Sequence, residues 1–257
     1  MDSVNKTLFI PLYGKALVSR RGILLSDPKA EAIWADAGFP LGRKSRSKWL
    51  AFHMAMRASV FDRYADAMLA QYPDAAVLHL GCGLDSRVTR IAHRDARWYD
   101  VDFPAVIDQR RRYYSETANY RMIGGDLRDA DWLEEIPRSG TAVILLEGVS
   151  MYLGREALED AITRWRGHFD RVFLLMDCYS EFAARASRIK NPVNEVGVTQ
   201  VYGMDSPELD AIGFFRAHEM TPPDLIAQLK PGEQFLFRRL YAGAFARKLY
   251  KIYEYRG

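Results

Sequence analysis

The spacing of hydrophobic residues is helical in the first part of the chain and changes after it. Residues 47–73 place apolar side chains three and four positions apart, which predicts a long helix with one buried face. Residues 27–38 run from Asp27 to Gly38, residue types that favour the first turn and the end of a helix. We therefore expect residues 1–75 to form a helical N-terminal extension.

Short apolar runs alternate with helical patterns over the next hundred residues. Five of these runs are typical of strands buried on both faces: 75–80, 96–102, 120–127, 141–148 and 171–177. Helical patterns, such as residues 155–169, separate them. Strands that alternate with helices at this spacing form βαβ units, so the sequence predicts an α/β fold with a mostly parallel sheet.

The last third of the chain has a looser pattern. Residues 178–235 mix Gly, Pro and Asn with short helical pieces, and we expect them to form a lid over the ligand-binding edge of the sheet. Residues 248–255 alternate as a strand does, so we expect closing strands over 236–257. Together with the extension and a cofactor-binding core over 76–177, all residues 1–257 are expected to form a single domain.

The composition is that of an ordinary globular protein. Hydrophobic residues make up 49%, and the net charge of +3 is too small to indicate nucleic acid. Two cysteines suggest no disulfide framework, and the first residues do not resemble a signal peptide. We expect a cytoplasmic protein with no membrane or nucleic-acid partner and no metal.

Residues that could bind a ligand lie where the predicted strands end. Doubly wound sheets bind their ligands at this edge. They follow four successive strands: Gly81, Cys82 and Gly83; then Asp102; then Asp126 and Leu127; then Glu147 and Gly148. Asp102 could accept hydrogen bonds from two ribose hydroxyls, and Asp126 from an adenine amino group while Leu127 packs on the ring. Each alone would suit a structural turn, but together they favour a nucleoside site.

The glycine turn favours a nucleoside without a phosphate. A dinucleotide fingerprint needs Gly or Ala at the position of Ser86, although a nicotinamide dehydrogenase stays an alternative. S-adenosylmethionine carries no phosphate, but its carboxylate needs a cation. Arg57 and Lys15 are candidates, since a guanidinium binds a carboxylate through two hydrogen bonds. The simpler explanation of Arg57 is a solvated helix residue.

Several segments in combination resemble a known family. "VLHLGCGLDSRVTRI", "RWYDVDFPAVIDQRRR", "GGDLRDADWL" and "ILLEGVSMYL" are similar to the leucine carboxyl methyltransferase family of S-adenosylmethionine-dependent enzymes. The chain looks most like its tetracenomycin-type polyketide O-methyltransferase branch, which "TLFIPLYGKALVSRRGILLSDPKA" and "NPVNEVGVTQVYGMDSPELD" also resemble. The resemblance implies a class I methyltransferase fold with a Rossmann-like sheet, and S-adenosylmethionine as cofactor.

The resemblance also implies a role for each site residue. Arg57 would hold the methionine carboxylate beside Lys15, Gly81 and Gly83 would form the methionine turn, Asp102 would bind the ribose, Asp126 and Leu127 would frame the adenine, and Glu147 would line the pocket behind the amino group. The chain departs from the pattern at His79, where class I methyltransferases often carry an acid, and at Ser86, where many relatives carry Thr.

The catalytic requirements depend on the acceptor. Methyl transfer from a sulfonium is an in-line displacement, so positioning supplies much of the rate. A carboxylate acceptor is ionised at pH 7, whereas a phenol would benefit from a base. Tyr152 could donate to an acceptor oxygen, and His53, one helical turn before Arg57, could be the base. A packing role explains Tyr152 equally simply, and a lone His such as His53 is more often structural.

We expect an O-methyltransferase that acts on a carboxylate or hydroxyl of a small molecule of specialised metabolism. The main alternative is a carboxyl methyltransferase that acts on the C-terminus of a peptide or protein. An open groove with exposed hydrophobic side chains around 180–235 would favour the peptide, and a closed pocket the small molecule. A catalytically silent protein that keeps the nucleoside site is a further alternative. The acceptor's identity and the oligomeric state stay open.

Overall fold

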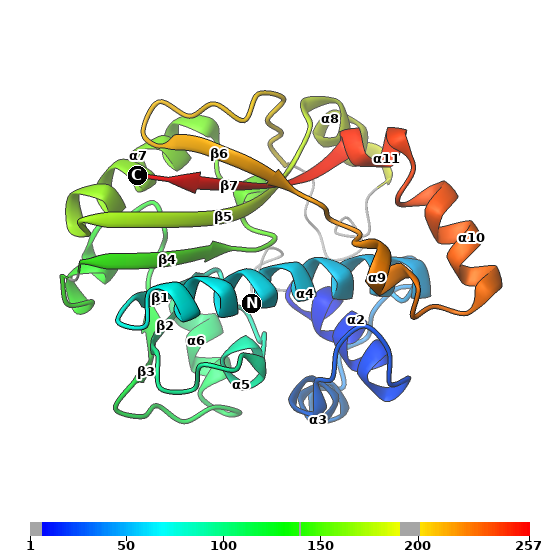
Figure 1. Cartoon of the computed structure of the whole chain (residues 1–257). Helices are drawn as coiled ribbons and strands as arrows, with labels where there is room; N and C mark the ends of the chain where they lie inside the picture. The colour runs from blue at the N-terminus through cyan, green and yellow to red at the C-terminus, as the bar shows by residue number, and fades with distance from the viewer. Residues whose placement is uncertain (1–6, 139, 191–200) are drawn as a thin grey trace.

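The computed structural model describes residues 7–138, 140–190 and 201–257, without the side chains of residues 188–190. A seven-stranded sheet in the order β3-β2-β1-β4-β5-β7-β6 forms its centre (Figure 1). Its strands are β1 (Ala76–Leu80), β2 (Arg97–Asp102), β3 (Tyr120–Gly124), β4 (Thr141–Leu146), β5 (Arg171–Tyr179), β6 (Gly213–His218) and β7 (Tyr250–Arg256). The predicted α/β fold is confirmed, and a strand lies at each of the five predicted core positions.

Helices flank this sheet and make up most of the chain before it. In chain order they are α2 (Phe9–Arg20), α3 (Pro28–Ala37), α4 (Lys48–Gln71), α5 (Arg87–Arg90), α6 (Pro104–Arg110), α7 (Arg155–His168), α8 (Glu181–Lys190), α9 (Pro223–Ile226), α10 (Pro231–Leu240) and α11 (Ala244–Leu249), with 3-10 turns η1 (Asp131–Glu135) and η2 (Ser150–Tyr152). The predicted ends of α3 are confirmed, because Asp27 accepts a hydrogen bond from the Ala30 amide and Gly38 adopts a φ of 57°.

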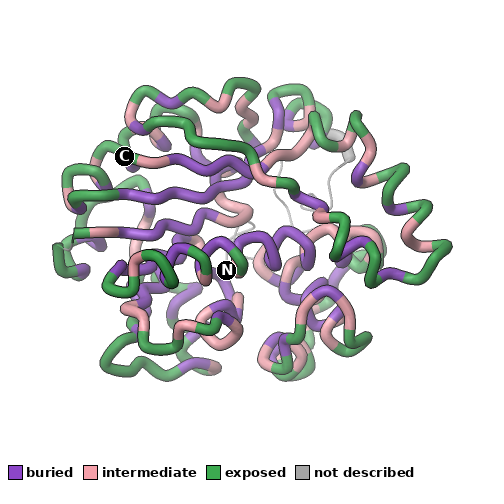
Figure 2. The backbone as a smooth tube through the Cα atoms, in the orientation of Figure 1, coloured by how far each residue is buried: buried purple, intermediate pink, exposed green. Residues whose placement is uncertain are grey.

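The sheet separates two hydrophobic cores. β1 to β5 pair in parallel, and β7 runs antiparallel between β5 and β6. Successive residues of β1 point to opposite faces, so Val77 packs in the core beneath α4 and Leu78 in the core beneath α7. Every residue of β1 is buried, and the central strands form the buried middle of the molecule (Figure 2).

The last third of the chain differs from its prediction in two places. Closing strands were expected over 236–257, but α10 and α11 occupy this range as far as Leu249, and the one strand in it is β7. Apart from Phe245, the residues of α11 (AFARKL) have high helix propensity. The range 178–235 also contributes β6, an edge strand whose exposed residues give no continuous apolar run. In the described part of the chain, no helix is long and apolar enough to span a membrane.

Candidate active site

The carboxyl ends of β1, β2 and β4 and the turn after β3 border one cavity of about 530 Å³. The cavity is lined by every site residue that the sequence predicts: Lys15, His53, Arg57, Gly81, Cys82, Gly83, Asp102, Asp126, Leu127, Glu147, Gly148 and Tyr152. Parallel strands end at one edge of a sheet, which brings these distant segments together. Helices α2 and α4 add residues from the N-terminal part of the chain, so the cavity lies between the sheet edge and these helices.

The turn after β1 requires glycine. Gly81 and Gly83 have φ values of 66° and 53°, in the left-handed region that other residues rarely adopt. A Cβ on Gly81 would also clash with the side chain of Val149. Cys82 between them is buried, and burial raises the pKa of its thiol well above the usual range. The thiol therefore stays protonated, and the turn serves to bring backbone to the cavity.

We expect Gly81→Ala to destabilise the fold by about 3 kcal/mol, because it adds a steric clash to an unfavourable φ. Gly22→Ala is the matched control, since Gly22 has a φ of 64° but no atom within 4 Å of the place that a Cβ would take. The control should cost only about 1 kcal/mol. Urea unfolding of both variants measures the difference, and equal losses would show that the contact with Val149 is irrelevant.

Asp102 ends β2 with its carboxylate held by backbone amides alone. Its Oδ2 accepts a hydrogen bond from the Gly83 amide at 2.7 Å, and its Oδ1 accepts one from the Phe103 amide at 2.7 Å. Burial raises the pKa of Asp102 to about 6 despite these two hydrogen bonds. The carboxylate faces the cavity and forms no salt bridge with a described residue, so its remaining lone pairs can accept further donors.

Asp126 and Leu127 lie in the turn after β3. Arg128 Nε donates to Asp126 Oδ1 at 2.9 Å, and this hydrogen bond lowers the pKa of the Asp126 carboxyl. The Leu127 side chain is buried and packs in the core beneath α7. This part of the cavity therefore offers one ionised carboxylate and one apolar surface side by side.

Arg57 is buried and binds two carboxylates. The simpler explanation, that it is a solvated helix residue, is therefore wrong. Its Nε donates to Glu147 Oε1 at 2.9 Å, and its Nη1 donates to Asp177 Oδ2 at 2.9 Å and to the Tyr250 hydroxyl at 2.6 Å. Gly148 lies against the third nitrogen: a Cβ there would be 3.2 Å from Nη2. No described residue accepts a hydrogen bond from Nη2, so this edge of the guanidinium is available to a ligand.

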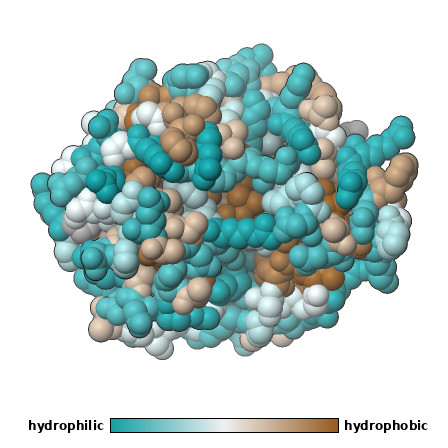
Figure 3. Space-filling view, in the orientation of Figure 1, coloured by the Kyte–Doolittle hydropathy of each residue, from teal (hydrophilic) through white to brown (hydrophobic). Residues whose placement is uncertain are grey.

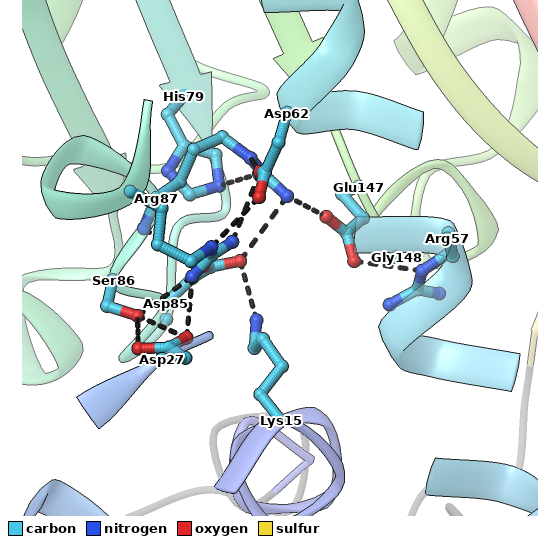
Figure 4. Close-up of polar contacts among 12 residues, drawn as sticks. Lys15, Asp27, Arg57, Asp62, His79, Asp85, Ser86, Arg87, Glu147 and Gly148 are labelled. Carbon is cyan, nitrogen blue, oxygen red and sulfur yellow. Dashed lines mark hydrogen bonds and ion pairs between the residues drawn. The ribbon is translucent and has the colours of Figure 1, made fainter. Parts of the chain in front are cut away.

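Lys15 is also buried and paired. Its Nζ donates to Asp85 Oδ2 at 2.6 Å (Figure 4). Asp85 in turn accepts a hydrogen bond from Arg90 Nη1 at 2.9 Å. Burial alone would raise the pKa of Glu147, but Arg87 and Arg57 beside it hold this pKa at about 2. The floor of the cavity is thus a continuous network of ionised groups.

Comparison with known proteins identifies the family of this chain. The family model described as leucine carboxyl methyltransferase matches residues 2–165. The tetracenomycin polyketide synthesis O-methyltransferase TcmP of Streptomyces glaucescens is 30% identical over 244 residues, which cover 92% of this chain and 90% of that protein. The chain belongs to the leucine carboxyl methyltransferase family. Leucine carboxyl methyltransferase 1 of Eremothecium gossypii matches a shorter part, with 28% identity over 37% of this chain and 38% of that protein.

Solved structures agree with this family's fold. A candidate methyltransferase from Thermobifida fusca superposes with a TM-score of 0.57 at 16% identity, covering 88% of this chain and 87% of its own. Magnesium protoporphyrin IX methyltransferase from Synechocystis, solved with bound S-adenosylhomocysteine, gives a TM-score of 0.50 at 12% identity, with coverages of 89% and 92%. This family member is an S-adenosylmethionine-dependent methyltransferase, and the dehydrogenase alternative is wrong.

The two predicted catalytic residues of this leucine carboxyl methyltransferase family member stand on different elements. Tyr152 ends η2, and burial raises the pKa of its hydroxyl. His53 lies on α4, with its ring 5.8 Å from the Tyr250 ring and 6.0 Å from the Tyr241 ring. Burial, together with the Arg57 charge, lowers the pKa of His53 to about 4. His53 is therefore neutral at pH 7 and a weak base.

The sequence analysis missed several groups that hold Arg57 and Glu147 in place. Asp177 and Tyr250 come from β5 and β7 and meet at Arg57, and Arg87 on α5 pairs with both Asp62 and Glu147. The only available signal was Asp177 at the end of a predicted strand. The family departure at His79 has a structural partner, because its Nδ1 lies 3.0 Å from Asp100 Oδ1 and its Nε2 lies 2.9 Å from Arg87 Nη1.

The second departure, Ser86, also belongs to the charged network. Its hydroxyl lies within hydrogen-bond distance of both carboxylate oxygens of Asp27, at 2.5 and 2.6 Å. Figure 4 shows the Ser86 hydroxyl beside Asp27, and Arg90 Nη1 donates to the same Asp27 at 2.7 Å. Ser86 therefore ties the helical N-terminal segment to the turn after β1.

Proposed function

We propose that this enzyme transfers a methyl group from S-adenosylmethionine to an oxygen of a small-molecule acceptor, with a carboxylate as the favoured target. The observation that carries this proposal is the lining of one cavity. It combines residues suited to bind a nucleoside with a wall of aromatic rings. Its volume of about 530 Å³ lies in the range of small-molecule pockets. The relative TcmP, which this chain matches over most of its length, is named as an O-methyltransferase of polyketide synthesis.

The residues at the floor of the cavity fit the cofactor. Arg57 offers the two N–H donors of Nη2 to a carboxylate, and Lys15 adds positive charge nearby. Asp102 offers a carboxylate without a cationic partner, which suits two ribose hydroxyls. The Arg57 side chain is buried and Asp102 is half-buried, and both keep unused hydrogen-bonding capacity facing the cavity. Such groups are costly to bury unless a ligand completes them.

The other predicted residues would complete the same site. Asp126 would accept from the adenine amino group, and Leu127 would pack on the ring. The turn of Gly81, Cys82 and Gly83 would approach the methionine part, which Glu147 and Gly148 would enclose from the side of β4. When bound, S-adenosylmethionine supplies an electrophilic methyl group on a sulfonium.

The chemistry of His53 favours a carboxylate acceptor. A phenol has a pKa near 10, so its proton would have to move to a histidine whose pKa is about 4. A carboxylate is already ionised at pH 7 and needs no such transfer. We propose that Tyr152 donates a hydrogen bond to the acceptor oxygen and that neutral His53 orients the acceptor. Both residues line the cavity, so each can reach a bound acceptor.

The acceptor side of the cavity is drawn from the two ends of the single domain. Leu50 and Met54 come from the helical N-terminal segment, and Tyr241 and Leu249 come from the segment after β6. Residues 1–6 and 191–200 of the predicted N-terminal extension and lid lie outside the described residues. We propose that residues 7–75 and the described parts of 178–235, with α10 and α11 after them, close over an acceptor bound beside the core of 76–177.

A peptide C-terminus is the second candidate acceptor, and one observation favours it. Large apolar side chains are exposed next to the cavity: Leu240, itself a cavity residue, is 58% exposed, and Phe245 is 67% exposed. The Phe182 ring of α8 packs 6.4 Å from the Phe245 ring. Apolar side chains also show on α10, at the right of the face in Figure 3. Exposed apolar surface of this kind often marks a docking site.

Acceptor screening with chemical identification of the product tests the proposal. Matched aromatic and aliphatic carboxylic acids, phenols and short peptides with free C-termini would be incubated with labelled S-adenosylmethionine. A carboxyl methyl ester releases volatile methanol in mild base, whereas a phenol ether does not. We expect base-labile product from small carboxylic acids. Base-stable product would overturn the carboxylate assignment, and activity with peptides alone would support the second candidate.

A further inference from the structure

We propose that Asp177 is a positioning residue that holds the Arg57 guanidinium in its cofactor-binding orientation, with Tyr250 as the third member of the arrangement. The proposal rests on the proposed role of Arg57 in binding the cofactor carboxylate. Asp177 and Tyr250 were not among the predicted site residues. Both are brought to Arg57 only by the folded sheet, from β5 and β7.

The Asp177 carboxylate uses both oxygens, and each faces a different part of the site. Oδ1 accepts a hydrogen bond from the Gly148 amide at 2.6 Å, and Oδ2 accepts from Arg57 Nη1 at 2.9 Å. Oδ2 also accepts a hydrogen bond from the Tyr250 hydroxyl. The Asp177 side chain is fully buried, so water does not replace these partners. One carboxylate therefore fixes the turn after β4, the guanidinium on α4 and the ring on β7.

Tyr250 couples this arrangement to the acceptor wall. Its hydroxyl donates to Asp177 and accepts from Arg57 Nη1, so its rotation is fixed. Its ring packs 4.6 Å from the Tyr179 ring and 5.8 Å from the His53 ring, and all three residues line the cavity. A shift of the Asp177 carboxylate would thus move both the cofactor ligand and the aromatic wall.

The orientation of Arg57 depends on two anchored edges. Glu147 accepts from Nε, while Asp177 and Tyr250 both accept from Nη1, and no described residue accepts from Nη2 beside Gly148. Without Asp177 the guanidinium loses one acceptor at Nη1, and the Tyr250 hydroxyl loses the partner that fixes its rotation. Asparagine cannot replace the carboxylate, because it has one acceptor oxygen where three donors need two.

Calorimetric titration of the full chain with S-adenosylmethionine tests this role without any acceptor. We expect Asp177→Asn to raise the Kd about tenfold and Tyr250→Phe, which keeps the ring, to raise it about threefold. Glu254→Gln is the matched control: Glu254 is a buried β7 carboxylate bound by Arg216 and Arg256, and it does not line the cavity. The control should lower the unfolding temperature but leave the Kd unchanged.

A double-mutant cycle separates positioning from general stability. In an Arg57→Lys background the ammonium lacks the fork that Asp177 orients, so adding Asp177→Asn should change the Kd less than twofold. Additive losses, or an unchanged Kd in Asp177→Asn alone, would overturn the positioning role. If Asp177→Asn does not fold, an unchanged Kd in Tyr250→Phe overturns it instead. An unchanged Kd in Arg57→Lys would contradict the proposed cofactor role of Arg57 itself.

Discussion

Replacement of Asp102 by alanine should weaken S-adenosylmethionine binding about 100-fold while the protein stays folded. The Asp102 carboxylate would accept hydrogen bonds from two ribose hydroxyls, and charge-assisted bonds of this kind contribute about 3 kcal/mol together. Calorimetric titration measures the change. Asp108→Ala is the control, because this aspartate lies on the exposed side of the neighbouring α6, with a side chain 75% exposed.

The same carboxylate gives this binding a pH dependence. Because the pKa of Asp102 is about 6, the affinity of the wild-type protein should fall as the pH drops below 6, when the ligand-accepting form is lost. The folding contribution has the opposite sign: a raised carboxyl pKa means that the folded state binds the proton more tightly, so stability from this group is lost as pH rises through 6. Wild-type affinity in Asp102→Ala would remove Asp102 from the ribose site, and an affinity that does not fall below pH 6 would contradict the raised pKa of Asp102.

Arg57→Gln should have the largest effect on the fold. It leaves the Asp177 carboxylate buried without a cation and removes one of two arginines beside Glu147, which typically costs about 3–5 kcal/mol. It also removes the proposed ligand of the cofactor carboxylate, so S-adenosylmethionine should no longer raise the unfolding temperature. Thermal unfolding with and without the cofactor measures both effects.

The control for this variant lies on the same helix. Arg63 is on α4 and pairs with Asp224 at 2.5 Å, but its side chain is 53% exposed. Arg63→Gln should therefore change stability by less than about 1 kcal/mol and leave the cofactor-dependent stabilisation intact. Equal losses of stability in the two variants would mean that the buried ion pairs of Arg57 contribute no more to folding than the exposed pair of Arg63.

The sequence predicts the parallel core well because each strand carries its own signal. Continuous apolar runs such as residues 75–80 arise where both faces of a strand are covered, and the structure has β1 there. Asp27 and Gly38 likewise mark the ends of α3 through local chemistry. β6 carries no such signal, because an exposed edge strand needs no apolar run.

The predicted site residues are drawn together because strand ends converge, which topology alone requires. Their partners could not be read in the same way. Arg87 is fully buried between Asp62 and Glu147, yet in the sequence it is one of two arginines on the short helix α5, with nothing to mark it as buried. Which charged residue becomes buried depends on contacts between distant segments, and a single sequence carries no signal for those contacts.

The hydrogen bond from Arg57 to Tyr250 joins positions 193 residues apart. Tyr250 belongs to β7, which docks between β5 and β6 and pairs with both. During synthesis, therefore, the parallel strands β1 to β5 are made before the strand that carries this anchor of the guanidinium. With the proposed cofactor role of Arg57, competence to bind the methyl donor should appear only once β7 has inserted between β5 and β6.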